Sequence, residues 1–138
     1  MSDPAFLDTN VLVYMALQPD SRSETARALL ARRGTISVQV LNEFVNVAHR
    51  KLRQPWPEIM KAVGAIRELC PSPAPITLAT HDAALGIASR TGYQFYDALI
   101  IASAPESGCT TLFSEDLQDG QVVEGRLTIR NPFGTPGQ

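Results

Sequence analysis

The chain has 138 residues, of which 44% are hydrophobic and 19% charged, and its formal net charge is −2. The length and composition are typical of one globular domain over residues 1–138. The net charge excludes a strong overall attraction to nucleic acid, so a bound polyanion would need local cations or a metal. No apolar run approaches the ~18 residues that cross a bilayer and no basic start precedes an apolar stretch, so we expect a cytoplasmic protein.

The predicted elements alternate between short apolar strands and amphipathic helices. The first strand is the apolar run that ends at Asp8. The further strands are expected over residues 35–37, 109–113 and 127–130, the last as an edge strand, with an extended piece over 76–78. The helices are expected over residues 11–17, 22–33, 38–53, 57–69 and 80–91, and from Asp97 to just before Gly108. This alternation predicts an α/β fold with a mainly parallel sheet covered on both faces.

Cap residues and apolar stripes set the expected helix bounds. Gly34 and Gly92 are expected as C-caps, and Thr80 as an N-cap. The apolar stripe of the helix over 57–69 is favoured as core over a binding surface, and it consists of Trp56, Ile59, Met60, Val63 and Ile66. The two cysteines, Cys70 and Cys109, are too few and too far apart for a disulfide framework or a zinc site, so we expect reduced, packed thiols.

A basic cluster closes the helix over residues 38–53. His49, Arg50 and Lys51 fall at its end, with Arg53 just beyond them. Cations suit the negative end of a helix dipole, so a structural role is favoured over RNA contact.

Four acids stand in apolar surroundings, unlike most of the others. Asp8 and Asp116 follow apolar strands, Asp97 starts an apolar helix, and Glu43 lies beside an apolar stripe. Taken alone, Asp8 is best interpreted as a cap of the next turn. Because the carboxyl ends of parallel strands and the starts of the following helices meet at one edge, the four are expected to converge.

Converging carboxylates repel one another, and a hard divalent cation relieves that repulsion. Oxygen ligands favour Mg²⁺ or Mn²⁺ over zinc. Such an ion lowers the pKa of a bound water and bridges a phosphate, which makes metal-dependent phosphodiester hydrolysis the natural chemistry. The sequence has no Gly-rich phosphate loop and no His beside a Ser or Cys nucleophile. A glycosidase fits so small a chain less well.

Five stretches, in order along nearly the whole chain, resemble the PIN-domain ribonucleases, and in particular VapC-type toxins of bacterial toxin–antitoxin pairs. They are FLDTNVL at residues 6–12, VLNEF at 40–44, YDALI at 96–100, SEDLQDG at 114–120 and IRNPF at 129–133. The resemblance implies a three-layer α/β/α sandwich with a short, mainly parallel sheet, whose acids bind Mg²⁺ or Mn²⁺ and cleave RNA. It also implies a homodimer and a small antitoxin protein.

Each acid takes a role from this resemblance. Asp8 and Asp97 match metal ligands, Glu43 a ligand or an orienting group, and Asp116 a residue that holds the ion through water or positions the nucleophile. Asp119 is a candidate fifth acid. The polar positions beside the site are Thr9 and Ser114. Pro105, inside the helix after Asp97, departs from the pattern and is expected to kink or shorten that helix near its end.

Two other functions remain open from the sequence. One is a PIN-like module without catalysis that binds a protein or RNA. The other is a housekeeping nuclease that processes RNA or DNA. The presence of all four acids favours an enzyme.

Overall fold

The computed structural model describes residues 4–17, 20–32 and 34–134. Twelve elements follow one another along these residues: β1 (Ala5–Leu7), α1 (Thr9–Ala16), α2 (Ser23–Ala31), β2 (Gly34–Thr35), α3 (Val38–Asn46), the π-helical turn η1 (Val47–Lys51), α4 (Trp56–Leu69), α5 (Leu78–Thr91), α6 (Phe95–Glu106), β3 (Thr111–Phe113), β4 (Val122–Val123) and β5 (Leu127–Arg130). No helix in these ranges is both long and apolar enough to cross a bilayer.

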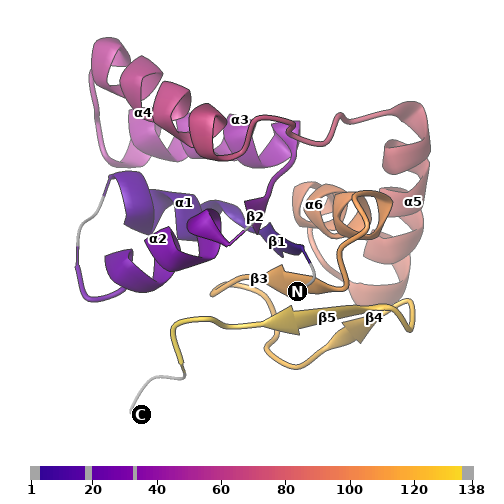
Figure 1. The fold of residues 1–138 in the computed structure, drawn as a ribbon. Helices are drawn as coiled ribbons and strands as arrows, with labels where there is room; N and C mark the ends of the chain where they lie inside the picture. The colour runs from indigo at the N-terminus through magenta and orange to yellow at the C-terminus, as the bar shows by residue number, and fades with distance from the viewer. Residues whose placement is uncertain (1–3, 18–19, 33, 135–138) are drawn as a thin grey trace.

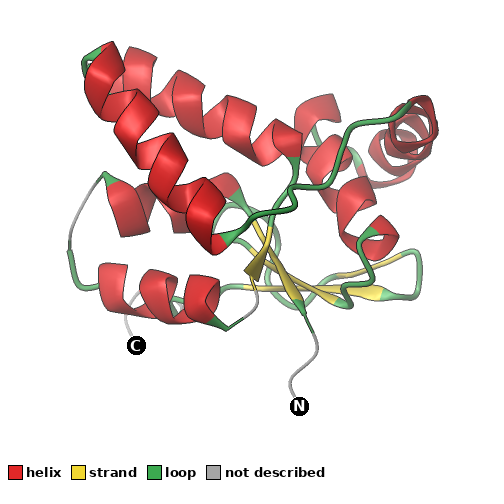
Figure 2. Ribbon diagram, turned by 45° about the horizontal axis from the view of Figure 1, so that its top comes forward, coloured by secondary structure: helices red, strands yellow, loops and turns green. Residues whose placement is uncertain are grey.

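The strands form one sheet in the order β2-β1-β3-β5-β4. The pairs β1–β2, β1–β3 and β3–β5 are parallel, and only β4 runs antiparallel to its neighbour. In Figures 1 and 2, α1 and α2 lie on one side of the sheet and α5 and α6 on the other, while α3 and α4 lie together beyond β2. The expected three-layer α/β/α fold with a mainly parallel sheet is therefore confirmed.

The core runs through the middle strands and the helix that covers them. Phe6 and Leu7 of β1 and Leu112 of β3 are fully buried. In α6 every residue from 98 to 104 is buried, so this helix is enclosed on all sides. Burial of each large aliphatic side chain contributes roughly 1.5–3 kcal/mol, so these elements hold the residues at their ends firmly in place.

Two expectations about the sheet were wrong. Residues 127–130 do form a strand, but β5 lies between β3 and β4 and is not an edge. The edge is β4, a two-residue strand too short to show a period of two. The extended piece expected over 76–78 was wrong in its end: Thr77 does have extended backbone, but as the N-cap of α5, and Leu78 is the first residue of that helix.

Two of the expected caps were also wrong. Gly34 is a residue of β2, and a Cβ built there would lie 2.6 Å from Leu7 Cδ1, so this glycine permits close packing of β2 on the neighbouring elements. The N-cap of α5 is Thr77, whose hydroxyl accepts from the Thr80 N–H while Thr80 bonds back to Thr77. The two residues form a capping box. Gly92 is a left-handed C-cap, as predicted.

Several helix bounds differ from the expected ones. The first helix begins directly after Asp8, and the second ends at Ala31, while Arg33 lies outside the described residues. The α-helix after Ser37 ends at Asn46 and continues as η1. The helix that was expected to start at Asp97 starts at Phe95, and it ends at Glu106, one residue after Pro105.

The stripe of α4 is core only in part. Ile59 and Ile66 are buried, but Trp56 is 51% exposed and Met60 is 71% exposed. The helical period therefore predicted the helix correctly but placed two large side chains in the core that lie on the surface. Both cysteines are buried free thiols, as expected.

Candidate active site

The carboxyl ends of β1 and β3 lie side by side and place Asp8 beside Ser114. The Asp8 N–H donates to the Phe113 carbonyl at 2.9 Å, which extends the parallel pairing by one residue. The Ser114 hydroxyl donates to Asp8 Oδ2 at 2.7 Å, and the Thr9 N–H donates to Oδ1 at 2.7 Å. Asp8 is thus the N-cap of α1, as the simplest interpretation held, yet its carboxylate also faces a pocket.

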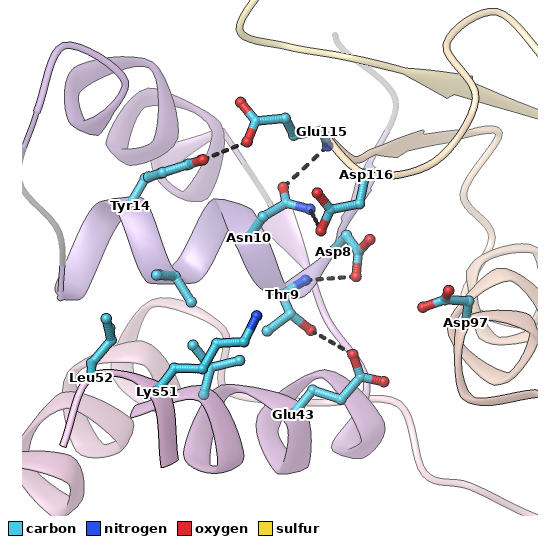
Figure 3. A pocket seen from close by; sticks show the side chains of 12 residues that line it. Asp8, Thr9, Asn10, Tyr14, Glu43, Lys51, Leu52, Asp97, Glu115 and Asp116 are labelled. Carbon is cyan, nitrogen blue, oxygen red and sulfur yellow. Dashed lines mark hydrogen bonds between the residues drawn. The ribbon is translucent and has the colours of Figure 1, made fainter. Parts of the chain in front are cut away.

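That pocket brings the four predicted acids together. Its wall includes Asp8, Glu43, Asp97 and Asp116, and Figure 3 shows them arriving from the end of β1, from α3, from α6 and from the loop after β3. They are accompanied by five other polar or charged residues: Thr9, Asn10, Tyr14, Lys51 and Glu115. The acids predicted from widely separated stretches therefore share one cavity.

Hydrogen bonds orient two of the remaining three acids. Glu43 Oε1 accepts from the Thr9 hydroxyl at 3.3 Å, and its Oε2 accepts from Gln39 Nε2 at 3.1 Å. Asp116 Oδ2 accepts from Asn10 Nδ2 at 3.3 Å. The Asp97 carboxylate has no hydrogen-bond partner among the residues that the structure describes, although it lies in the first turn of the firmly held α6. Its oxygens are therefore the ones most available to a ligand.

Burial and mutual repulsion make the acids reluctant to ionise together. Burial raises the pKa of Asp8 from 3.8 to about 6, against the lowering effect of its bonds from Ser114 and Thr9. Burial also raises the pKa of Glu43 and of Asp97, and the nearby carboxylates add to both. A cation placed among these groups would reverse that effect, because an opposite charge favours the ionised form.

The donor set fits a hard divalent cation. All four groups are carboxylates, which Mg²⁺ and Mn²⁺ prefer over softer ligands. In the ranges described, no three acidic, histidine or cysteine side chains lie close enough to enclose one ion directly. Mg²⁺ commonly keeps several waters and is bound by one or two carboxylates.

The candidate fifth acid, Asp119, is not part of the pocket wall. Its Oδ1 accepts from the Asn131 N–H at 2.8 Å and so ties the loop after β3 to the residue that follows β5. This contact gives Asp119 a structural role beside the carboxyl end of β5.

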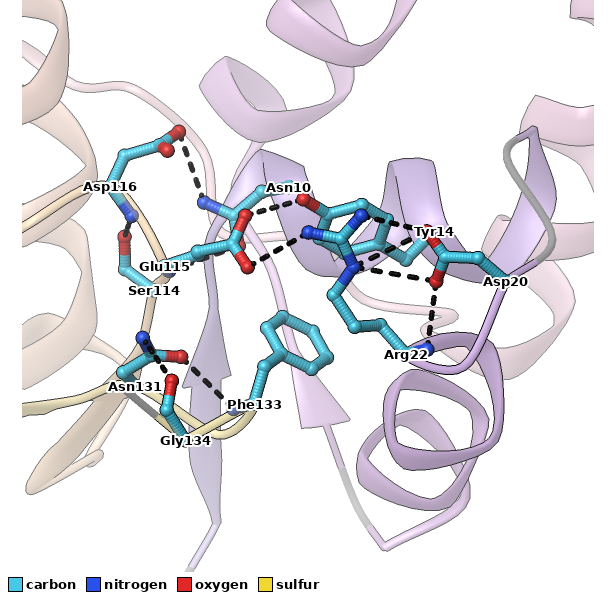
Figure 4. A network of polar contacts seen from close by, with 10 residues as sticks. All are labelled: Asn10, Tyr14, Asp20, Arg22, Ser114, Glu115, Asp116, Asn131, Phe133 and Gly134. Atoms are coloured by element: carbon cyan, nitrogen blue, oxygen red, sulfur yellow. Dashed lines mark hydrogen bonds and ion pairs between the residues drawn. The ribbon is translucent and has the colours of Figure 1, made fainter. Parts of the chain in front are cut away.

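A polar network that the sequence did not predict borders the pocket (Figure 4). Glu115 accepts a hydrogen bond from the Tyr14 hydroxyl. Its Oε2 also forms an ion pair with Arg22 Nη1, at 3.2 Å. The Arg22 guanidinium also lies 3.9 Å above the centre of the Tyr14 ring. Burial, followed by the bond to Glu115, raises the pKa of Tyr14 to about 12.

This network holds the loop that carries Asp116. The Glu115 N–H donates to Asn10 Oδ1 at 3.2 Å, while the same Asn10 side chain donates to Asp116. A signal was present in the sequence, since Asn10 and Tyr14 are four residues apart and so share a helix face. Their partner Glu115 could not be identified, because an acid in a polar loop has no distinguishing pattern.

Comparison with known proteins defines the class. The chain matches the PIN domain family over residues 5–119 and belongs to that family, as the resemblance implied. Among solved structures, it is similar to the Mycobacterium tuberculosis toxin VapC20, described as cleaving the sarcin-ricin loop, with 21% identity, a TM-score of 0.62 and coverage of 81% of this chain and 89% of that one.

Two complexes extend the structural likeness. A toxin–antitoxin complex from Klebsiella pneumoniae has a TM-score of 0.71 at 17% identity, covering 95% of this chain and 99% of that one. VapBC2 from Rickettsia felis, bound to a DNA fragment from its promoter, has a TM-score of 0.64 at 17% identity, covering 93% and 98%. No curated protein matches the chain. At these identities the likeness shows a shared fold.

Proposed function

We propose that this protein is a metal-dependent endoribonuclease that acts as the toxin of a toxin–antitoxin pair. The observation that carries the proposal is the pocket in which Asp8, Glu43, Asp97 and Asp116 meet within a PIN domain. The similarity to VapC20, described as a toxin that cleaves the sarcin-ricin loop, and to toxin–antitoxin complexes supports the toxin role.

In this proposal Asp8 and Asp97 bind Mg²⁺ or Mn²⁺. Glu43 is either a further ligand of the ion or a group that orients the ligands, and Asp116 holds the ion through a water molecule or positions the nucleophile. When bound, the ion lowers the pKa of a water and offsets the charge of the phosphate. Ser114 and Thr9 fix the Asp8 carboxylate, and Asn10 fixes that of Asp116.

The charge around the pocket suits a phosphodiester substrate only once the acids are neutralised. Lys51 is the single cation among the side chains that form the pocket wall in the described structure. With a pKa of about 6, Asp8 is largely ionised at neutral pH and available to a cation. Asp97, which has no protein partner in the described ranges, is available as well.

The partners follow from the same proposal. An acidic pocket attracts a guanidinium, whose planar fork pairs bidentately with carboxylates, so an antitoxin Arg placed there would compete with the metal. Leu78 and Leu85 of α5 and Tyr96 of α6 are exposed hydrophobic residues that a homodimer would cover. A cytoplasmic location stays a prediction.

The test is cleavage of a structured ribosomal-RNA fragment by the purified chain with Mg²⁺, with Mn²⁺ and with EDTA. We expect cleavage only with metal, and a loss of at least ~100-fold in Asp8→Asn and Asp97→Asn, because catalysis by positioned charges contributes about that much or more. Each variant should keep its circular dichroism spectrum. Undiminished cleavage by either folded variant, or cleavage in EDTA, would contradict the proposal.

A further inference from the structure

The turn η1 and the residues just after it carry a basic cluster. His49, Arg50, Lys51 and Arg53 are all exposed. No carboxylate of the described residues lies within ion-pair distance of any of them, as is also true of other exposed arginines such as Arg67 and Arg126, so what sets this cluster apart is that its basic residues lie close together in the chain. In a chain of net charge −2, this cluster is a local concentration of unneutralised positive charge.

The backbone here is arranged so that the cations point in two directions. In η1 the Leu52 N–H donates to the Val47 carbonyl at 3.1 Å, five residues back, and Lys51, the last residue of this turn, points toward the acidic pocket (Figure 3). Arg53 then adopts a left-handed backbone with φ of 52°, which is uncommon for a residue with a side chain. π-helical turns occur often at functional sites.

The other basic residues border a second hollow. His49, Arg50 and Arg53, together with Gln54, line this hollow. Lys51 lines the acidic pocket and Arg50 lines the second hollow, and the two residues are consecutive in η1, so one short basic segment borders both hollows.

An aromatic surface adjoins the cations. The rings of His49 and Trp56 are stacked, with centroids 4.2 Å apart and an interplanar angle of 23°. Even so, 51% of Trp56 remains exposed. The helix dipole explains cations in the last turn, but its effect fades within that turn, so it explains neither Arg53 nor the exposed indole.

We propose that the segment from His49 to Trp56 binds single-stranded RNA, with Lys51, Arg50 and Arg53 along the phosphates and one base stacked near Trp56, and that it leads the strand to the acidic pocket. Basic side chains beside an exposed aromatic ring are the combination that binds single strands. Because the same segment also lines the acidic pocket through Lys51, RNA is favoured over an acidic protein. The inference rests on the proposed function, because it concerns the substrate of that site.

The test uses the fact that Trp56 is the only tryptophan. In an Asp97→Asn background, which prevents cleavage, a 12-nucleotide oligo(U) RNA is titrated at several salt concentrations and the intrinsic fluorescence is recorded. We expect saturable quenching. Trp56→Ala, followed with a labelled oligo(U), should bind at least about fivefold more weakly, because stacking of one base contributes that much.

The role of the arginines is tested with two double variants that carry the same change in charge. Arg50→Gln/Arg53→Gln should weaken binding and lower the slope of log K against log[salt] by about 1.4, near 0.7 for each lost phosphate contact. The control, Arg67→Gln/Arg126→Gln, removes two exposed cations elsewhere and should leave that slope unchanged.

The outcomes separate this inference from the proposed function. Oligo(U) binding without quenching, or equal slopes in the two double variants, would overturn the RNA path even if the wild type cleaves RNA. If instead an acidic protein partner, but not oligo(U), lost affinity in Arg50→Gln/Arg53→Gln, the surface would be a protein site and the inference would fail. Quenching and a reduced slope without metal-dependent cleavage would support the path and contradict the enzyme.

Discussion

At the scale of single residues, Asp8 combines two roles with opposite demands. As the N-cap of α1 it accepts hydrogen bonds as a carboxylate, yet burial and the neighbouring acids favour its protonated form. Without a cation, the ionised side chain lowers the stability of the fold. This is the pattern of a group kept for a ligand at some expense in stability.

The stability of the metal-free protein should therefore fall as Asp8 ionises. Its pKa is about 6 in the folded chain and near 3.8 in the unfolded chain, so the stabilising effect of the bound proton is complete below about pH 4 and is lost as the pH rises through about 6. The difference amounts to about 3 kcal/mol. In Asp8→Asn the drop in unfolding free energy between pH 4 and 7 should be smaller than in the wild type.

Urea unfolding in EDTA at several pH values measures this, with Asp82→Asn as the control because Asp82 is an exposed acid of α5. Glu43 and Asp97 have pKa values raised in the same direction, so part of the drop should remain in Asp8→Asn. Identical pH dependence in Asp8→Asn and wild type would show that Asp8 is not destabilising when ionised.

The acids also differ in their expected weight in catalysis. Glu43 lines the pocket and is bound by Thr9, whereas Asp119 lies outside the pocket wall and holds Asn131. On the same RNA, Glu43→Ala should lose at least about tenfold in kcat/KM, because it removes a charge from the site, and Asp119→Ala should lose little. A larger loss in Asp119→Ala would reverse this ranking.

At the scale of the elements, the sequence predicted the helices and four of the five strands, but not how these elements contact one another. Asp8, Glu43, Asp97 and Asp116 could be identified because each is an acid in apolar surroundings. The π-helical turn, the strand β4 and the place of Glu115 depend on contacts between distant segments, which no local pattern encodes. Thr77 and Thr80 illustrate the limit, since both suit an N-cap and only their mutual bonds decide.

Gly34 was expected to end a helix, but it lies in β2, where the absence of a Cβ permits close packing. A Cβ at this position would lie 2.6 Å from Leu7 Cδ1 and 3.1 Å from the Leu29 carbonyl oxygen. Gly34→Ala should lower the unfolding free energy by roughly 1–3 kcal/mol, the usual cost of overpacking. Chemical denaturation measures the effect.

Gly64 provides the matched control, because it lies within α4 and a Cβ there would meet nothing within 4 Å. Gly64→Ala should raise the unfolding free energy by roughly 0.5–1 kcal/mol, since alanine is the better helix former. If the two substitutions changed stability alike, close packing would not be the reason for glycine in β2.

At the scale of the whole molecule, the topology explains why acids far apart in the sequence converge. Placing β1 next to β3, both parallel, sets Asp8 beside Ser114 and the loop of Asp116. The apolar α6 packs behind this edge and brings Asp97 to face it (Figure 3). The sequence predicted this convergence from the rule for parallel sheets, while the strand order itself was not predicted.

The central claim is that these four carboxylates form one site for a divalent cation, and Mn²⁺ binding tests it most directly. Electron paramagnetic resonance of free Mn²⁺ gives the affinity at neutral pH without any assay of cleavage. We predict that the wild type binds Mn²⁺, that Asp97→Asn binds at least about tenfold more weakly because one ligand charge is lost, and that Asp82→Asn binds like the wild type. Equal affinity in the wild type and Asp97→Asn, or no binding to the wild type at millimolar Mn²⁺, would contradict the claim.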